Sequence, residues 1–308
     1  MTALDTDRIV TETAKLIADH YVFPDIAEQL SALLADRLAA GHYGAAGIAE
    51  ELGALVTEDL QSVNGDRHLR LQYHAEEVPA EPGGAVLAEI TREADGSMNG
   101  VPLVRRLDGG VALLELAPII FPMTLKDGAT GETLRAALNL VACAEALIID
   151  LRRTRGGSPD TVAFICGYLL DESTHVNTTY WRDGDSYAQS WSPAYVPGPR
   201  FGGSKPLYVL TSGSSFSGAE ELAYDLQQLG RAVVVGERSR GGAHPREGYT
   251  VHPHLEATVP TGRSVNPVSG TDWEGVGVQP DIEVPAAEAL DRAHREALTA
   301  LAAPSSAS

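Results

Sequence analysis

Ser217 lies where an apolar run at residues 208–210 gives way to small residues and then to a helical pattern from Ala219. A hydroxyl at the N-terminus of a helix lies beside backbone N–H groups without helical partners, and these stabilise a developing oxyanion. Serine is also a favoured N-cap residue, and Glu220, three positions later, completes a capping box. The spacing alone therefore predicts either a nucleophile or an ordinary helix cap, and the cap is the commoner case.

Gly156 and Gly157 follow a second apolar run, at residues 146–149, and precede a helix that begins near Pro159. Glycines let a backbone approach a ligand closely and expose its N–H groups. This turn could therefore supply an oxyanion hole, or it could be an ordinary connection from strand to helix. The sequence contains neither the P-loop pattern nor the dinucleotide-binding glycine pattern, so it predicts no nucleotide site.

A histidine and a glutamate are candidates for the proton transfer that a serine nucleophile needs. His68 begins an alternating strand pattern, where a histidine can act as a general base but is more often structural. Glu274 lies in a turn between a tryptophan and a glycine, where its carboxylate could orient a catalytic group or be solvated. His252 and His254 have the spacing of a metal-binding pair on a strand, but the sequence shows no third ligand. Zinc sites use at least three protein ligands, so we predict no metal and no cofactor.

The composition limits the partners and the compartment. The 308 residues carry 42 acidic and 23 basic side chains, a net charge of −19. Nucleic-acid binding needs clustered lysine and arginine, so this charge argues against it and favours solubility. The N-terminus lacks a secretory apolar core and no apolar run is long enough to cross a membrane, so we expect a cytoplasmic protein without membrane insertion. Cys143 and Cys166 lie in apolar stretches, where buried, reduced thiols are expected.

The elements that position these residues follow from the apolar pattern. Three runs with apolar residues every three to four positions lie within residues 9–60, and they predict a small three-helix bundle. An alternating strand is expected at residues 69–73. Residues 75–98 contain a proline- and glycine-rich break that suits a domain junction.

Beyond this break, strands and helices alternate along the chain, which predicts an α/β core with a partly parallel sheet. We therefore expect an N-terminal helical cap domain at residues 1–75 and an α/β core domain at residues 76–308.

The segments around His68, Gly156, Ser217 and Glu274 occur in the same order as the motifs of a known superfamily, and further motifs lie between them. The chain resembles the tail-specific proteases, and specifically the branch that includes the tricorn protease core and interphotoreceptor retinoid-binding protein. The motifs that carry this resemblance are, in order, Tyr21-Val-Phe-Pro, Asp66-Arg-His-Leu-Arg, Asp150-Leu-Arg with Gly156-Gly157, Phe216-Ser-Gly-Ala-Glu-Glu, Gly241-Gly-Ala-His-Pro and Trp273-Glu-Gly-Val-Gly-Val. The resemblance extends over nearly the whole chain.

The resemblance implies a fold and a set of roles. The core would be a crotonase/ClpP-like superhelix of β-β-α units, with the three helices as a cap. Ser217 would be the nucleophile, His68 the base and Glu274 the carboxylate of the site. The oxyanion hole would use the backbone N–H of Gly218 and that of Gly156 or Gly157.

One branch of the superfamily can be excluded from the residues. Its members use a Ser–Lys dyad with the lysine after the serine, whereas no lysine follows Ser217 in this chain. The corresponding segment begins at Arg238, and arginine does not deprotonate near neutral pH. A histidine base remains, with His244 as the alternative to His68.

Two departures from the family pattern concern substrate recognition. Arg67 stands where the tricorn-like site has a second serine that links the glutamate to the histidine, so Arg67 could instead contact a substrate carboxylate. No segment is long enough for a PDZ domain between cap and core, so selection would fall to the cleft itself.

We therefore expect a serine hydrolase, most simply a peptidase, that forms an acyl-enzyme on a peptide or small acyl substrate and could form homo-oligomers. One alternative is a non-catalytic binding protein for retinoid- or fatty-acid-like molecules, whose pocket the aromatic cluster Trp181, Tyr187, Trp191 and Tyr195 could line. A second alternative is a tailoring enzyme that transfers or cyclises small acyl groups, because fold does not determine substrate.

Overall fold

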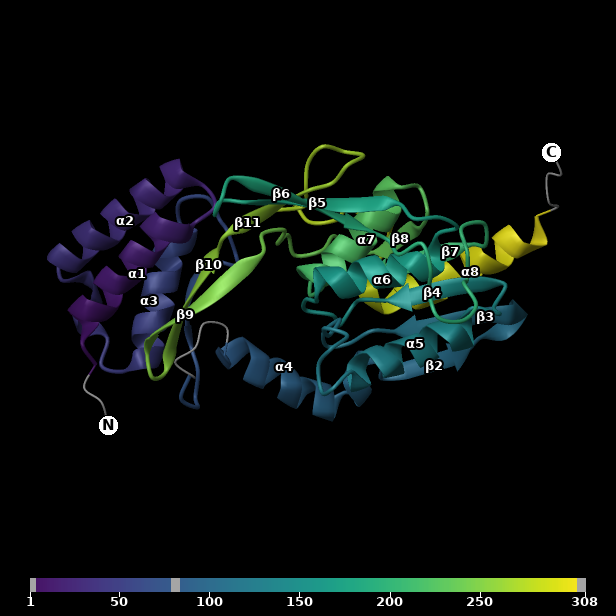
Figure 1. Cartoon of the computed structure of the whole chain (residues 1–308), viewed down its shortest axis with the longest axis horizontal. Helices are drawn as coiled ribbons and strands as arrows, with labels where there is room; N and C mark the ends of the chain where they lie inside the picture. The colour runs from purple at the N-terminus through teal and green to yellow at the C-terminus, as the bar shows by residue number, and fades with distance from the viewer. Residues whose placement is uncertain (1–3, 79–83, 304–308) are drawn as a thin grey trace. The chain divides into compact units, whose positions relative to one another are not determined.

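The computed structural model describes residues 4–78 and 84–303, and Figure 1 traces the path of the chain. The chain divides into two compact units, each assembled from separate segments. The first comprises residues 1–89, 179–188 and 244–264, and the second comprises residues 90–178, 189–243 and 265–308. The expected boundary between residues 75 and 76 concerns contiguous domains and stays a prediction.

The first unit contains the three predicted helices, α1 (Thr6–His20), α2 (Pro24–Ala39) and α3 (Ala49–Gln61). Pro24 occupies the first turn of α2, where its missing N–H costs no hydrogen bond. The helices share an apolar core with an antiparallel sheet of order β1-β10-β9, made of β1 (Arg70–Tyr73), β9 (Arg246–His252) and β10 (Leu255–Pro260). The three-helix prediction and the strand predicted near residues 69–73 are both confirmed.

The second unit is built on a six-stranded sheet of order β12-β8-β7-β4-β3-β2. Every neighbouring pair is parallel except β2 with β3. The strands are β2 (Leu103–Arg106), β3 (Val111–Glu115), β4 (Ala146–Asp150), β7 (Leu207–Thr211), β8 (Val233–Gly236) and β12 (Ile282–Glu283). All residues of β3, β4 and β7 are buried, as expected for parallel strands covered on both faces.

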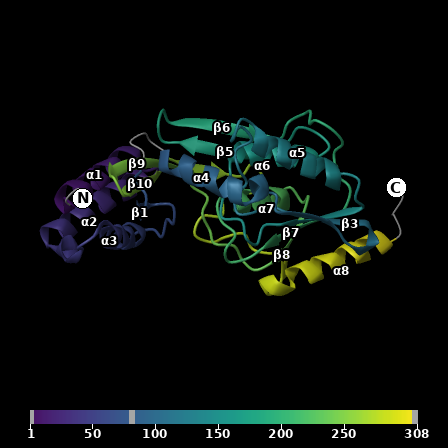
Figure 2. The same cartoon turned by 90° about the horizontal axis from the view of Figure 1, so that it is seen from below.

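Helices cover the two faces of this sheet, and alternate strand residues face each side. Leu147 and Ile149 share a core with α5 (Ala129–Val141), α6 (Pro159–Leu169) and α7 (Gly218–Gln228). Ile148, between them, packs instead with α8 (Ala289–Ala302). Figure 2 shows α8 on one side of the strands and α5 and α6 on the other. The mixed α/β class with a mostly parallel sheet is confirmed.

A third sheet, of order β11-β5-β6, consists of β5 (His175–Trp181), β6 (Ser186–Trp191) and β11 (Gly262–Val265). Each of these strands contains a boundary between the two units. Short 3₁₀ turns complete the described elements, at His42–Ala45, Met98–Gly100, Asp108–Gly110 and Ala286–Glu288.

The segment predicted as a proline- and glycine-rich break, residues 75–98, contains helix α4 (Gly84–Gly96). Ile90 and Ala94 are four positions apart, so they lie on one face of the helix and pack with Phe121 and Leu125. The break itself falls on residues 79–83, which lie outside the described residues. The short apolar periodicity after the glycines explains why a helix forms there.

The expectation of two buried thiols is half wrong. Cys166 is buried in α6, but Cys143 is exposed in the turn that follows α5. An apolar neighbourhood in sequence does not bury a residue at the end of a helix, because the chain must turn at the surface there. In the described part of the chain, none of the helices has both the length and the apolar character that crossing a bilayer requires.

Candidate active site

Ser217 occupies a strained turn between strand β7 and helix α7. Its φ is 54° and its ψ is −123°, and it directly precedes the first residue of the helix. A side chain with positive φ clashes with its own backbone, and such conformations cost of order 1–3 kcal/mol and concentrate at functional sites. A strained serine between a strand and a helix is the geometry of a nucleophile elbow, which exposes the hydroxyl.

The buried carboxylate of Glu220 holds this turn in place. It accepts hydrogen bonds from the backbone N–H of Ser217 at 2.8 Å and from Ser239 Oγ at 2.5 Å. The backbone N–H groups of Gly241 and Gly242 donate to it as well, at 2.6 and 2.9 Å. Burial raises the pKa of Glu220, and these four donors oppose that shift because they favour the ionised form. Glu220 was predicted only as half of a capping box, but it also ties the serine turn to the loop at residues 239–242.

The loop that leads into Ser217 is pinned to the segment after strand β4. Ser212 Oγ donates to the carbonyl of Arg152 at 2.6 Å, and Ser215 Oγ donates to that of Leu151 at 2.8 Å. The backbone N–H of Phe216 donates to the carbonyl of Thr154 at 3.1 Å. These contacts were not predicted, and the only signal in the sequence is the run of small hydroxyl residues before Ser217.

The predicted glycines lie beside Ser217. A Cβ atom added to Gly218 would lie 2.7 Å from backbone atoms of Gly157, so glycine is needed for this approach. A Cβ atom on Gly156 would lie 3.8 Å from Cβ of Ser217. The structure therefore brings three of the expected oxyanion-hole residues together around the serine.

The orientation of the glycine turn follows from its pairing with Ile120. The N–H of Ile120 donates to the carbonyl of Gly156 at 3.0 Å, and the N–H of Ser158 donates to the carbonyl of Ile120 at 2.9 Å. In such a parallel bridge the N–H of the intervening residue, Gly157, points away from its partner strand. The direction of this N–H is compatible with a role in binding an oxyanion.

Glu274 lies in the same unit, in a turn that the adjacent indole anchors. Trp273 Nε1 donates to the carbonyl of Gly242 at 2.8 Å, and Glu274 Oε2 accepts from the N–H of Ala243 at 2.5 Å. Trp273 is buried, so the turn is firmly packed. Glu274 therefore contacts the residue that immediately precedes His244 in the chain.

In the first unit, Asp66 is the centre of a buried hydrogen-bond network. Its Oδ1 accepts from the backbone N–H of His68 at 3.0 Å. Its Oδ2 lies 2.7 Å from Nδ1 of His244 and accepts from the hydroxyl of Tyr21 at 3.0 Å. Although burial alone would raise it, the pKa of Asp66 is lowered, because the hydrogen bond and charge of His244 favour the carboxylate. Asp66 thus orients His244 directly and the backbone of His68.

His68 itself is buried, with 7% of its surface exposed. Burial lowers the pKa of His68 to about 3, and the attraction of Asp66 only partly opposes this, while Arg246 lowers it further. The ring is therefore neutral near neutral pH. Arg67, the predicted substrate contact, has an exposed side chain.

Sequence reasoning identified His68 and His244 but missed the carboxylate that both histidines contact. The available signal was the two-residue spacing of Asp66 and His68, since an aspartate often bonds a backbone N–H two positions on. The contact with His244 spans 178 positions in sequence, and no local pattern predicts it.

Two descriptions of protein families match parts of the chain. Residues 120–284, more than half of the chain, match the family described as "Peptidase family S41". Residues 4–95 match the domain family described as "N-terminal domain of Peptidase_S41 in eukaryotic IRBP".

Solved structures with a similar fold cover almost the entire chain. A lipoprotein from Streptococcus agalactiae is 13% identical, with a TM-score of 0.61 over 97% of this chain and 98% of that one. The photosystem II D1 C-terminal processing protease is 13% identical, with a TM-score of 0.56 over 96% and 99%. The tricorn protease is 13% identical, with a TM-score of 0.60 over 96% of this chain and 37% of its own. These similarities show the fold, and the family matches show that the chain belongs to peptidase family S41.

Proposed function

We propose that this protein is a serine peptidase in which Ser217 attacks the scissile carbonyl of a peptide or small acyl substrate. The observation that carries the proposal is the positive φ of Ser217 at the turn between strand and helix, next to the Gly156–Gly157 turn. A helix cap alone does not need this conformation, because ordinary N-cap residues have negative φ in the β region. The strain is therefore better explained by the need to present the hydroxyl.

The proposed reaction divides peptide hydrolysis into two steps. His68 accepts the proton of Ser217 as Oγ bonds to the carbonyl carbon, and the carbonyl electrons move onto its oxygen. The N–H groups of Gly218 and of Gly156 or Gly157 stabilise this oxyanion. Collapse of the intermediate breaks the C–N bond, His68 returns the proton to the leaving amine, and water then hydrolyses the acyl-enzyme by the same route.

The roles of the acidic residues follow from charge. Each proton transfer to His68, from Ser217 or from the attacking water, creates an imidazolium, which a nearby carboxylate stabilises, and we assign this role to Glu274. The low pKa of His68 keeps its ring neutral before the attack, but a general base works best with a pKa near the operating pH, so the carboxylate must offset the effect of burial as the ring takes the proton.

His244 is the second candidate for the base. If its Nδ1 carries the proton that bonds to Asp66, Nε2 becomes the acceptor, as in a catalytic histidine oriented by aspartate. The buried Asp66 would then stabilise the imidazolium directly.

The binding-protein alternative receives less support from the described residues. Tyr187, Trp191 and Tyr195 are 64%, 51% and 78% exposed, so they do not enclose an apolar ligand. We further propose that the consecutive parallel strands β3, β4, β7 and β8 belong to a crotonase-like core, as the resemblance implies.

A fluorophosphonate probe and a peptide substrate library test the proposal together. The wild-type chain should be labelled at Ser217, and Ser217→Ala should lose labelling and at least about 1,000-fold in turnover. Ser214→Ala is the matched control, because Ser214 is an exposed serine in the same loop and should remain fully active. Unchanged hydrolysis by Ser217→Ala would overturn the assignment, and labelling combined with turnover of esters but not peptides would redirect it to an acyl hydrolase.

A further inference from the structure

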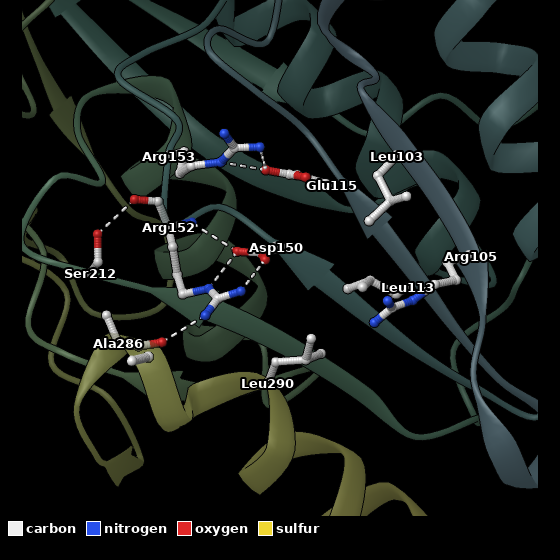
Figure 3. A pocket seen from close by; sticks show the side chains of 11 residues that line it. Leu103, Arg105, Leu113, Glu115, Asp150, Arg152, Arg153, Ser212, Ala286 and Leu290 are labelled. Atoms are coloured by element: carbon white, nitrogen blue, oxygen red, sulfur yellow. Dashed lines mark hydrogen bonds and ion pairs between the residues drawn. The ribbon is translucent and has the colours of Figure 1, made fainter.

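A cavity of about 500 Å³ opens at the carboxyl ends of strands β3 and β4, on the face of the sheet that α8 covers (Figure 3). Ligands of α/β proteins commonly bind at this end of parallel strands, and the volume lies in the range of small-molecule sites. The residues proposed for catalysis do not line it: among its lining residues, only Ser212 belongs to the loop that leads to Ser217. The cavity is therefore a separate site.

The apolar part of the lining comes from three elements. Leu103 on β2 and Leu113 on β3 face the cavity, with Leu290 of α8 opposite them. Charged side chains lie beside these leucines, so the lining combines apolar and charged groups, as Figure 3 shows. Such a lining suits a ligand with one apolar and one charged end.

Two of the three arginines in the lining already have carboxylate partners. Arg152 binds Asp150 through two hydrogen bonds of 2.9 and 2.6 Å and donates to the carbonyl of Ala286 at 2.6 Å. Arg153 donates twice to Glu115 Oε1, at 2.8 and 2.5 Å. These pairs neutralise both carboxylates of the cavity.

The third arginine, Arg105, has an exposed side chain at the cavity. Among the residues that the structure describes, none forms a hydrogen bond or ion pair with its guanidinium. The lining therefore has an excess of one positive charge, although the whole chain has a net charge of −19. A guanidinium with open donors beside apolar side chains recognises a carboxylate particularly well, because its planar fork matches the two oxygens.

We propose that this cavity binds a small organic monoanion, a carboxylate with a short apolar tail. The carboxylate pairs with Arg105, and the tail packs against Leu103, Leu113 and Leu290. The proposal concerns a site apart from Ser217, so it holds or fails independently of the peptidase assignment.

Hexanoate is a suitable probe, with neutral hexanamide as its control. Isothermal titration calorimetry on the full chain should show hexanoate binding that weakens about tenfold in Arg105→Ala and is equally weak for hexanamide. Arg106→Ala is the matched control, because Arg106 is the next residue of β2 and its side chain points to the opposite face. Hexanoate should bind this variant and Ser217→Ala as it binds the wild type.

Three results would overturn the proposal. One is equal hexanoate affinity in Arg105→Ala and Arg106→Ala, and another is equal affinity for hexanamide and hexanoate. The third is loss of hexanoate binding in Ser217→Ala, which would place the ligand at the serine. Circular dichroism of each variant distinguishes loss of binding from loss of fold, and Arg105→Glu provides a second variant that should bind more weakly still.

Discussion

The surroundings of Ser217 and of Asp66 are built in different ways. Around Ser217 the geometry depends mainly on backbone groups: a positive φ, a close approach of Gly157 to Gly218, and N–H and carbonyl groups that a few polar side chains bond. Around Asp66 it depends on side chains, since a single carboxylate contacts the ring of His244 and the hydroxyl of Tyr21.

This difference determines how each region responds to substitution. A turn held by backbone contacts tolerates the loss of a side-chain atom. It does not tolerate the gain of one where two backbone segments touch. A buried polar network has the opposite sensitivity, because removing one partner leaves the others without hydrogen bonds in a low-dielectric interior. The two regions can therefore be tested with opposite kinds of variant.

The largest expected effect on activity comes from removing one of the two histidines that contact Asp66. We expect His68→Ala to lower kcat about 1,000-fold, the middle of the 10²–10⁴ range that general-base catalysis contributes. His244→Ala should lower it about tenfold, through displacement of Asp66 and the backbone of His68. Steady-state kinetics and fluorophosphonate labelling rates measure both effects.

The reverse ranking would assign the base to His244. Equal, small losses in both variants would instead leave the chain without a histidine base and contradict the proposed mechanism.

Glu221 and Asp225 are two further buried carboxyl groups in the serine region. Both carboxyl groups are buried on helix α7, where Asn177 donates to Glu221 at 3.1 Å and Asn266 donates to Asp225 at 2.9 Å. Burial raises the pKa of Glu221 to about 7, and the hydrogen bond from Asn177 only partly opposes it. Burial also raises the pKa of Asp225, with the charge of Glu221 adding to the shift.

The sign of the resulting pH dependence is fixed by the direction of the shift. A carboxyl group with a raised folded-state pKa costs no stability below its unfolded pKa near 4.5, and the cost grows with pH from there until it levels off above about 7. The free energy of unfolding should therefore fall by about 3 kcal/mol between about pH 5 and pH 8, and Glu221→Gln should remove most of this fall. Urea unfolding at the two pH values measures it, with the exposed Glu28→Gln as control. Parallel curves for all three proteins would show that Glu221 ionises normally.

Much of the backbone-built region could be predicted from the sequence. The apolar runs at β4 and β7, each followed by small residues, indicated two strand-to-helix turns, and Gly156 and Gly157 indicated a close approach. Short-range patterns carry this information because a turn is determined by the residues within it. The positive φ of Ser217 was not predictable, because it is imposed by Glu220 and by the pinned loop.

The side-chain region could be predicted only in part. His68 and His244 were recognisable as titratable residues, but their common partner depends on the antiparallel packing of β1 with β10 and β9. Helix α4 and the exposed Cys143 were also missed, since both depend on where the chain meets solvent or a segment distant in sequence. Contacts distant in sequence are set by topology, and local periodicity does not contain them.

The pH dependence of kcat/KM tests whether His68 or His244 is the base. A base must be neutral to accept a proton, so kcat/KM falls as pH drops through the pKa of the base in the free enzyme. Because the pKa of His68 is lowered to about 3, kcat/KM should stay constant from about pH 7.5 to pH 5.5. A histidine with the ordinary pKa of about 6.5 would give a tenfold fall at about pH 5.5. Such a fall in the wild type, lost in His244→Ala, would contradict the role given to His68.

The smallest effect tests the strain at the nucleophile directly. Ser217→Gly and Ser217→Ala both lack the hydroxyl, but only glycine adopts φ of 54° without a steric cost. We expect the glycine variant to be more stable by about 1 kcal/mol, despite the greater entropy of its unfolded chain. At Ser214, in the same loop but without a positive φ, the glycine variant should be the less stable of the pair by a few tenths of a kcal/mol. Urea unfolding of the four variants gives the stability difference between glycine and alanine at each position. The same sign at both positions would mean that the turn at Ser217 stores no strain. Its resemblance to a nucleophile elbow would then lose its physical basis.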